Sequence, residues 1–182
     1  MKETLRRLSR KTVCEGKVLD FCEDTVRLPD GRVETWDFVH HRHGGGACVV
    51  PVLPDGRIVM VRQFRPAVGL MMLELPAGAR DPEDADTALT ALRELREETG
   101  FSADRLDFLA RIHSAPAFLD ETTDIYLAKD IEAVSPQHLD EAEDIRIEIC
   151  SLESLTADIS EGRITDAKTV AGLMAYAARV RQ

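Results

Sequence analysis

Residues 93–100 read RELREETG and carry three glutamates, Glu94, Glu97 and Glu98, separated by at most four positions. On an α-helix, side chains three and four positions apart are neighbours on one side. Like charges placed so close cost roughly a few tenths of a kcal/mol per pair, so helix propensity alone does not explain why the glutamates gather. A solvated helix face of mixed charge is the ordinary alternative, because two arginines belong to the same stretch. The surrounding sequence has to decide between a solvated face and a functional cluster.

The stretch ends a predicted amphipathic helix. Residues 81–100 begin with acidic residues, continue with a helical apolar pattern and end in Gly100, which suits the C′ position. The apolar positions are Ala88, Leu89, Leu92 and Leu95. Of these, Ala88, Leu92 and Leu95 define an arc that we expect to pack on a sheet, with Glu94 and Glu98 flanking it where solvent is thinner. Carboxylates gathered at such an edge raise a pKa or bind a cation, and clustered hard oxygens suit Mg²⁺ or Mn²⁺.

Strand patterns lie on both sides of this helix. Residues 11–41 alternate loosely around a PDG turn and predict two or three antiparallel strands, within an N-terminal β extension over residues 1–44. Residues 47–53 and 57–64, joined by a second PDG turn, predict a buried hairpin. Further strands are predicted over 105–113, 123–128 and 145–152, and helices over 152–162 and 166–181. This order predicts an α+β domain over residues 45–182, with a mixed sheet between helices.

Composition restricts the partners. The chain has 182 residues and a formal net charge of -10, which repels polyanions, so we expect no nucleic acid as a partner. The four cysteines form no C-x-x-C pair, no secretory signal follows MKETLRRLSRK, and no apolar run is long enough to span a bilayer. We therefore expect a cytoplasmic protein with reduced thiols and no membrane partner.

Residues 78–101, GARDPEDADTALTALRELREETGF, resemble the Nudix box, with a match at Gly78 and a full match from Arg93 to Phe101. The resemblance implies the Nudix fold and a loop-helix-loop that holds divalent metal, Mg²⁺ or Mn²⁺, for hydrolysis of a diphosphate linked to another moiety. The implied ligands are Glu94, Glu97 and Glu98, with a backbone carbonyl from Ala77 or Gly78.

The match has one departure in the loop before the helix. Asp84 stands where the family's isolated glutamate is expected, and the gap from Gly78 to Arg93 is one residue longer than usual. That glutamate usually pairs near the helix, so the resemblance implies that Asp84 or Asp86 substitutes for it.

Other segments narrow the resemblance to ADP-ribose pyrophosphatases within the Nudix group. They are VRQFRPAVGLMMLELPAG (61–78), APAF (115–118) in place of the usual SPGF, DEAEDIRI (140–147) and GRITDAKTVAGL (162–173). The resemblance implies Mg²⁺-dependent cleavage of ADP-ribose to AMP and ribose 5-phosphate. Two alternatives stay open: hydrolysis of another nucleoside diphosphate sugar, such as GDP-mannose or ADP-glucose, and a non-catalytic module that senses ADP-ribose.

The resemblance also implies a catalytic base on a late acidic loop. It aligns Glu141 with the base and keeps Glu143 in reserve, beside Glu98 of the box as a further catalytic carboxylate. A solvated acidic loop before a strand is the ordinary alternative for Glu141.

Substrate contacts are implied at five positions. Trp36 and Asp37 match residues that stack on the adenine and accept from its amino group, and Arg65 matches an arginine near the phosphates. His41, within HHRH, and Phe118, within APAF, are candidate lining residues. The ordinary alternatives are a core strand position for the tryptophan and an edge cation for the arginine. The resemblance further implies a homodimer whose N-terminal strands exchange between subunits.

Overall fold

A computed structural model describes residues 4–139 and 144–181 of the chain. By their internal contacts the residues divide into two compact units. The first is Met1–Gly45 with His113–Thr122, and the second is Gly46–Ile112 with Thr123–Gln182. The first unit thus includes a segment, 113–122, that follows the box helix in sequence.

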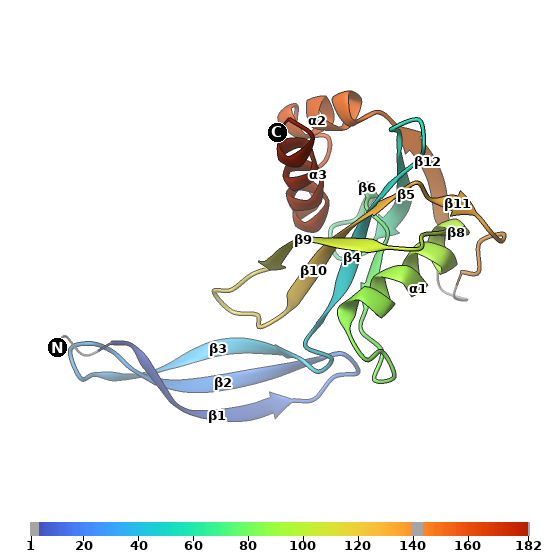
Figure 1. The fold of residues 1–182 in the computed structure, drawn as a ribbon. Helices are drawn as coiled ribbons and strands as arrows, with labels where there is room; N and C mark the ends of the chain where they lie inside the picture. The colour runs from blue at the N-terminus through green and yellow to red at the C-terminus, as the bar shows by residue number, and fades with distance from the viewer. Residues whose placement is uncertain (1–3, 140–143, 182) are drawn as a thin grey trace. The chain divides into compact units, whose positions relative to one another are not determined.

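The first unit is built on a three-stranded antiparallel sheet of order β1-β2-β3 (Figure 1), as the sequence predicts. Its strands are β1 (Arg6–Cys14), β2 (Leu19–Arg27) and β3 (Val33–His41). The β2 and β3 strands pair without interruption from Leu19↔His41 to Arg27↔Val33. The PDG turn between them places Gly31 at φ 87, a conformation that glycine adopts at little cost. Segment 113–122 joins this sheet through the Val39 N–H, which donates to the Phe118 carbonyl at 2.7 Å.

The second unit contains a seven-stranded sheet of order β12-β5-β4-β10-β9, with β6 on β5 and β7 on β4. Its strands are β4 (Gly45–Val52), β5 (Ile58–Arg65), β6 (Leu70–Glu74), β7 (Ala77–Ala79), β9 (Leu106–His113), β10 (Thr122–Lys129) and β12 (Ile145–Cys150). The predicted hairpin is confirmed, since β4 and β5 pair antiparallel at Val52↔Ile58. A short pair, β8 (Phe101–Ser102) and β11 (Glu132–Ala133), was not predicted.

Helices cover both faces of this sheet: α1 (Thr87–Thr99) on one, α2 (Leu152–Ser160) and α3 (Ala167–Val180) on the other (Figure 1). Alternation along β4 divides the core accordingly, because successive side chains of a strand point to opposite faces. Val49 packs in a cluster with Leu95 of α1, whereas Val50 packs in a cluster with Leu173 of α3. The predicted α+β domain with a mixed sheet between helices is confirmed. Within residues 4–139 and 144–181, no helix has both the length and the apolar character needed to cross a membrane.

The buried face of α1 extends beyond the predicted arc, of which Leu95 is buried while Ala88 and Leu92 are half-buried. Leu89 is 47% exposed, whereas Ala91 and Leu95 are completely buried and Glu94 and Glu98 lie beside them. The face is rotated toward the carboxylates because small Ala91 allows close approach to the sheet, and backbone at the β7 side gives the glutamates polar partners. The predicted end of the helix is confirmed, with Gly100 at φ 73.

Candidate active site

The centre of the candidate site is the contact between α1 and the short β7 strand. Glu94 and Glu98 are only 9% and 3% exposed, and the Ala77 N–H donates to Glu98 Oε2 at 3.0 Å. A Cβ built at Gly78 would lie 2.0 Å from Glu94 Oε1, so a glycine is needed for this carboxylate to occupy its position. The structure therefore brings Ala77, Glu94 and Glu98 of the predicted ligand set together.

Arg93 links the remaining glutamate to this centre. Its Nη1 donates to Glu94 Oε1 at 2.8 Å and to Glu97 Oε2 at 3.0 Å, and its Nη2 donates to the Ala79 carbonyl at 3.0 Å. Burial lowers the pKa of Arg93, but the charge of Glu94 and the hydrogen bond to Glu97 outweigh it, and the net shift is upward. The guanidinium thus offsets the repulsion between the clustered carboxylates.

The loop before the helix is fastened by two aspartates. Asp84 Oδ2 accepts from Thr90 Oγ1 at 2.8 Å and lies 3.4 Å from Arg93 Nη2, whereas Asp86 caps the helix by accepting from the backbone of its first turn. Burial raises the pKa of Asp84. The hydrogen bonds from Thr90, Asp81 and Arg93 lower it by a larger amount, so the net shift is downward. Asp84 is thus the aspartate whose side chain pairs with side chains of the box helix.

A second charged network lies at the end of β6. Arg65 donates to the Glu74 carboxylate from Nε and from Nη2, each at 2.8 Å, and Lys168 of α3 also contacts this carboxylate. Glu74 is 1% exposed; burial raises its pKa, but the hydrogen bond from Arg65 and the charge of Lys168 lower it, with a net downward shift. The hydrogen bond to Glu74 raises the pKa of Arg65, whereas burial lowers it. The charge of Glu98 also raises it, and the net shift is upward. Arg65 is therefore part of a partly buried ion pair near the box, rather than a solvated edge cation.

Glu74 and Lys168 did not emerge from the sequence as site residues. The available signals were a glutamate ending an apolar strand pattern and a lysine in the first turn of an apolar helix. Both signals are local, whereas the two residues are 94 positions apart and meet only in the folded chain.

The donor set fits a hard divalent cation in its chemistry, since the Glu94 and Glu98 carboxylates and the peptide at Ala77 and Gly78 offer only oxygen ligands. In the described part of the chain, no three acidic, histidine or cysteine side chains are placed to hold one ion. The third predicted ligand, Glu97, shares Arg93 with Glu94, but its side chain is 43% exposed. The two buried glutamates and the loop are thus the residues best placed to hold a metal.

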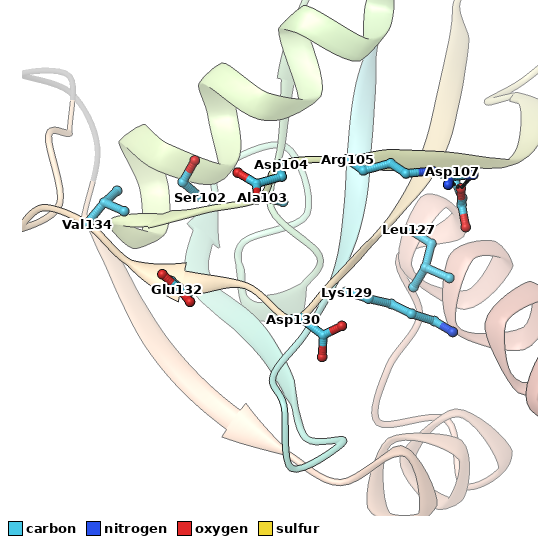
Figure 2. Close-up of a pocket in the computed structure, with 10 residues that line it drawn as sticks. All are labelled: Ser102, Ala103, Asp104, Arg105, Asp107, Leu127, Lys129, Asp130, Glu132 and Val134. Atoms are coloured by element: carbon cyan, nitrogen blue, oxygen red, sulfur yellow. Dashed lines mark hydrogen bonds and ion pairs between the residues drawn. The ribbon is translucent and has the colours of Figure 1, made fainter.

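Two hollows in the second unit are candidates for substrate binding. One of about 510 Å³ runs along the outer side of α1 and is lined in part by Arg93, Arg96, Glu97 and His138. The other, of about 500 Å³ (Figure 2), is open and polar, with side chains from the β8–β9 and β10–β11 regions around it. No predicted site residue lines the second hollow, so the first is the better candidate for substrate.

The predicted adenine-binding residues belong to the first unit. Trp36 is 41% exposed and Phe118 is 53% exposed, so the alternative of a core position for the tryptophan is wrong. Asp37 is exposed and pairs across the sheet with Glu23. His41 is buried, with Nε2 3.7 Å from Glu121 Oε1 and with Nδ1 lacking a hydrogen-bond partner among the described residues. The structure does not assign these side chains to one site with the box helix, which belongs to the second unit.

The predicted base, Glu141, and its reserve, Glu143, lie outside the described residues. Their assignment therefore stays a prediction.

Comparison with known proteins identifies the family of this chain. The Nudix domain family matches residues 42–173. The chain is 32% identical over 163 residues to the ADP-ribose pyrophosphatase of Bacillus subtilis, covering 89% of this chain and 86% of that protein. It is 33% identical over 164 residues to the methanol dehydrogenase activator of Bacillus methanolicus, covering 90% and 87%. A crystal structure of an ADP compounds hydrolase superposes with a TM-score of 0.85 at 20% identity, covering 100% of this chain and 96% of the other. The chain belongs to the Nudix family, and its predicted Nudix fold is confirmed.

Proposed function

We propose that this Nudix protein hydrolyses the diphosphate of ADP-ribose and releases AMP and ribose 5-phosphate. The observation that carries the proposal is the convergence of buried Glu94 and Glu98 on Ala77 and Gly78. Similarity along most of the chain to a protein named ADP-ribose pyrophosphatase supports the substrate.

The proposed cofactor is Mg²⁺, with Mn²⁺ as a substitute. Glu94 and Glu98 would hold it with the Ala77 carbonyl. Glu97 would join them by leaving its hydrogen bond with Arg93 and binding the metal instead. A bound divalent cation neutralises diphosphate oxygens and favours attack by water. Arg96, which lines the hollow beside the helix, is placed to attract an anionic substrate.

The proposed base is Glu141, with Glu143 as the reserve. A carboxylate there would take the proton of the attacking water, and Glu98 would serve the reaction from the box. For recognition, we assign Arg65 to the phosphates, Trp36 to the adenine ring and Asp37 to its amino group. His41 and Phe118 complete the proposed lining.

The proposed assembly is a cytoplasmic homodimer formed through the N-terminal strands. The separate three-stranded sheet supports this, because such small sheets gain stability from a partner surface. Exposed Leu19, Phe21 and Val33, which lie on one face of this sheet, agree with a covered surface.

A product assay tests the activity. Purified protein is incubated with ADP-ribose, GDP-mannose, ADP-glucose and NADH, each with Mg²⁺ or with a chelator, and the products are separated by chromatography. The proposal expects AMP and ribose 5-phosphate from ADP-ribose, dependent on the metal. Preference for another nucleotide sugar would reassign the substrate. Binding of ADP-ribose without turnover would favour the sensing module.

A further inference from the structure

The segment that carries the candidate metal-binding carbonyl is short and fixed at several points. Ala77 follows Glu74, Leu75 and Pro76 directly. The Pro76 carbonyl accepts from the Val49 N–H at 3.0 Å, and the Ala77 N–H donates to Glu98. Because the proline ring fixes φ, few backbone dihedrals remain free between Leu75 and Ala77. A shift at Leu75 is therefore transmitted to Ala77.

Leu75 is held by the first turn of α3. Its N–H donates to Thr169 Oγ1 at 2.9 Å, and the Thr169 hydroxyl donates to Asp166 Oδ2 at 2.6 Å. Asp166 is the N-cap of α3 and also accepts from the Thr169 N–H at 3.0 Å. Thr169 is completely buried, so no water replaces its hydroxyl if it is removed.

Lys168 fixes the preceding residue of the segment. Its ammonium contacts the buried Glu74 carboxylate and lies 3.0 Å from Asp166 Oδ2. The charges of Asp166 and Glu74 raise the pKa of Lys168 against the effect of burial, so the amine stays charged at neutral pH. Neighbouring residues of α3 thus hold neighbouring residues of the segment, one by a hydroxyl and one by an ion pair.

The close approach of α3 depends on Gly172. A Cβ at this position would lie 2.7 Å from Leu75 Cδ1 and 3.2 Å from Ile125 Cγ2. Gly172 lies one turn after Thr169, on the side of α3 that meets the same leucine. The helix therefore contacts Leu75 at two points, the backbone N–H of Leu75 and the side chain of Leu75.

We propose that Lys168 and Thr169 are positioning residues, which set the metal affinity of the box by holding the Glu74–Ala77 segment against Glu98. The inference rests on the proposed function, since it presumes that Ala77, Glu94 and Glu98 hold a divalent cation. The two residues touch neither metal nor substrate, and act through the backbone at Leu75 and the carboxylate of Glu74.

The experiment measures Mn²⁺ affinity directly, from the electron paramagnetic resonance signal of free Mn²⁺, without substrate. Thr169→Val keeps the shape of the side chain and removes the hydroxyl, whereas Thr169→Ser keeps the hydroxyl. Thr156→Val is the matched control, because the Thr156 hydroxyl donates to the Glu153 carbonyl within its own helix, α2. Thermal melting of each variant reports the fraction folded at the assay temperature.

Thr169→Val is expected to raise the Mn²⁺ dissociation constant about tenfold, the lower end of the range for groups that orient metal ligands. Thr169→Ser and Thr156→Val are expected to keep the wild-type value. If Thr169→Val does not fold, Lys168→Met is measured instead, with the same expected direction. Wild-type affinity in the folded variant, or equal weakening in Thr156→Val, would overturn the inference. Wild-type protein that neither binds Mn²⁺ nor hydrolyses ADP-ribose would overturn the proposed function instead.

Discussion

Gly78→Ala is the sharpest test of the site, because one added methyl group meets the box directly. The new Cβ would lie 2.0 Å from Glu94 Oε1 and 2.1 Å from its carboxyl carbon. Ordinary contact begins at 3.4 Å, so the carboxylate has to retreat by more than 1 Å. Gly78 has a negative-φ backbone that alanine also adopts, so the effect is steric and not a backbone strain.

A misplacement of about 1 Å in a catalytic group costs on the order of a hundredfold in rate, or about 2.7 kcal/mol of activation free energy. We therefore expect Gly78→Ala to lower kcat for ADP-ribose by roughly a hundredfold and to weaken Mn²⁺ binding, with little change in the melting temperature. The assay is steady-state hydrolysis at saturating Mg²⁺, with direct Mn²⁺ titration beside it.

Two variants separate this cause from others. Gly162→Ala is the control, because a Cβ there meets nothing within 4 Å and its φ of +73 confines the penalty to backbone strain. It should lose some stability and keep full activity. Adding Glu94→Asp to Gly78→Ala shortens the displaced side chain, so the two substitutions should combine with less loss than their separate effects predict. A Gly78→Ala protein with kcat and Mn²⁺ affinity within about threefold of wild type would refute the reasoning, since it is far from the roughly hundredfold loss expected.

Three further outcomes are expected. Glu98→Gln should lower the rate by orders of magnitude and keep the fold, because the glutamine amide oxygen still accepts from the Ala77 N–H. Metal-titrated kinetics with thermal melting checks this, and near wild-type turnover would remove Glu98 from the site. Glu141→Gln should reduce single-turnover rates strongly with little change in affinity, whereas Glu143→Gln should be mild; the reverse would place the base two residues later. The hydrogen bonds from Arg111 keep the folded-state pKa of Asp124 below its ordinary 3.8, so its stabilising effect is present above that pH and lost as the pH falls through the lowered pKa. Urea unfolding should therefore show a stability difference between wild type and Asp124→Asn that is full at neutral pH and shrinks below about pH 3.8; a difference independent of pH would contradict this.

The sequence predicts most of the second unit because its signals are local. The box helix carries its own cap at Asp86 and its own terminator at Gly100, and both act within a few residues of where they stand. The predicted buried arc of this helix missed Ala91, which is completely buried, for the opposite reason. Which face a helix buries depends on the surface it meets, and here that surface includes the Ala77 N–H, a polar partner that hydrophobic periodicity does not represent.

The network around Glu74 shows the same limit more strongly. Arg65 was identified only through the family resemblance, and the position near the phosphates that the resemblance implies predicts nothing of its two hydrogen bonds to Glu74. Lys168 reaches the same carboxylate from 94 positions away. A buried acid between two cations is stable only as a folded assembly, because each charge alone would be costly to bury.

The crowding of Glu94, Glu97 and Glu98 therefore has two explanations that apply to different residues. Glu97, directed to Arg93 with its side chain 43% exposed, fits the ordinary solvated face. Glu94 and Glu98 do not, because both are buried against backbone. Arg93 lies within 3.4 Å of Glu94, Glu97 and two loop aspartates, so one guanidinium faces four carboxylates. The two buried carboxylates, Glu94 and Glu98, present hard oxygen atoms, which are the ligands that a divalent cation of the Mg²⁺ type prefers. Arg93 thus fastens the loop to the helix together with Asp84 and Asp86, and a divalent cation held by Glu94 and Glu98 would offset part of their mutual repulsion.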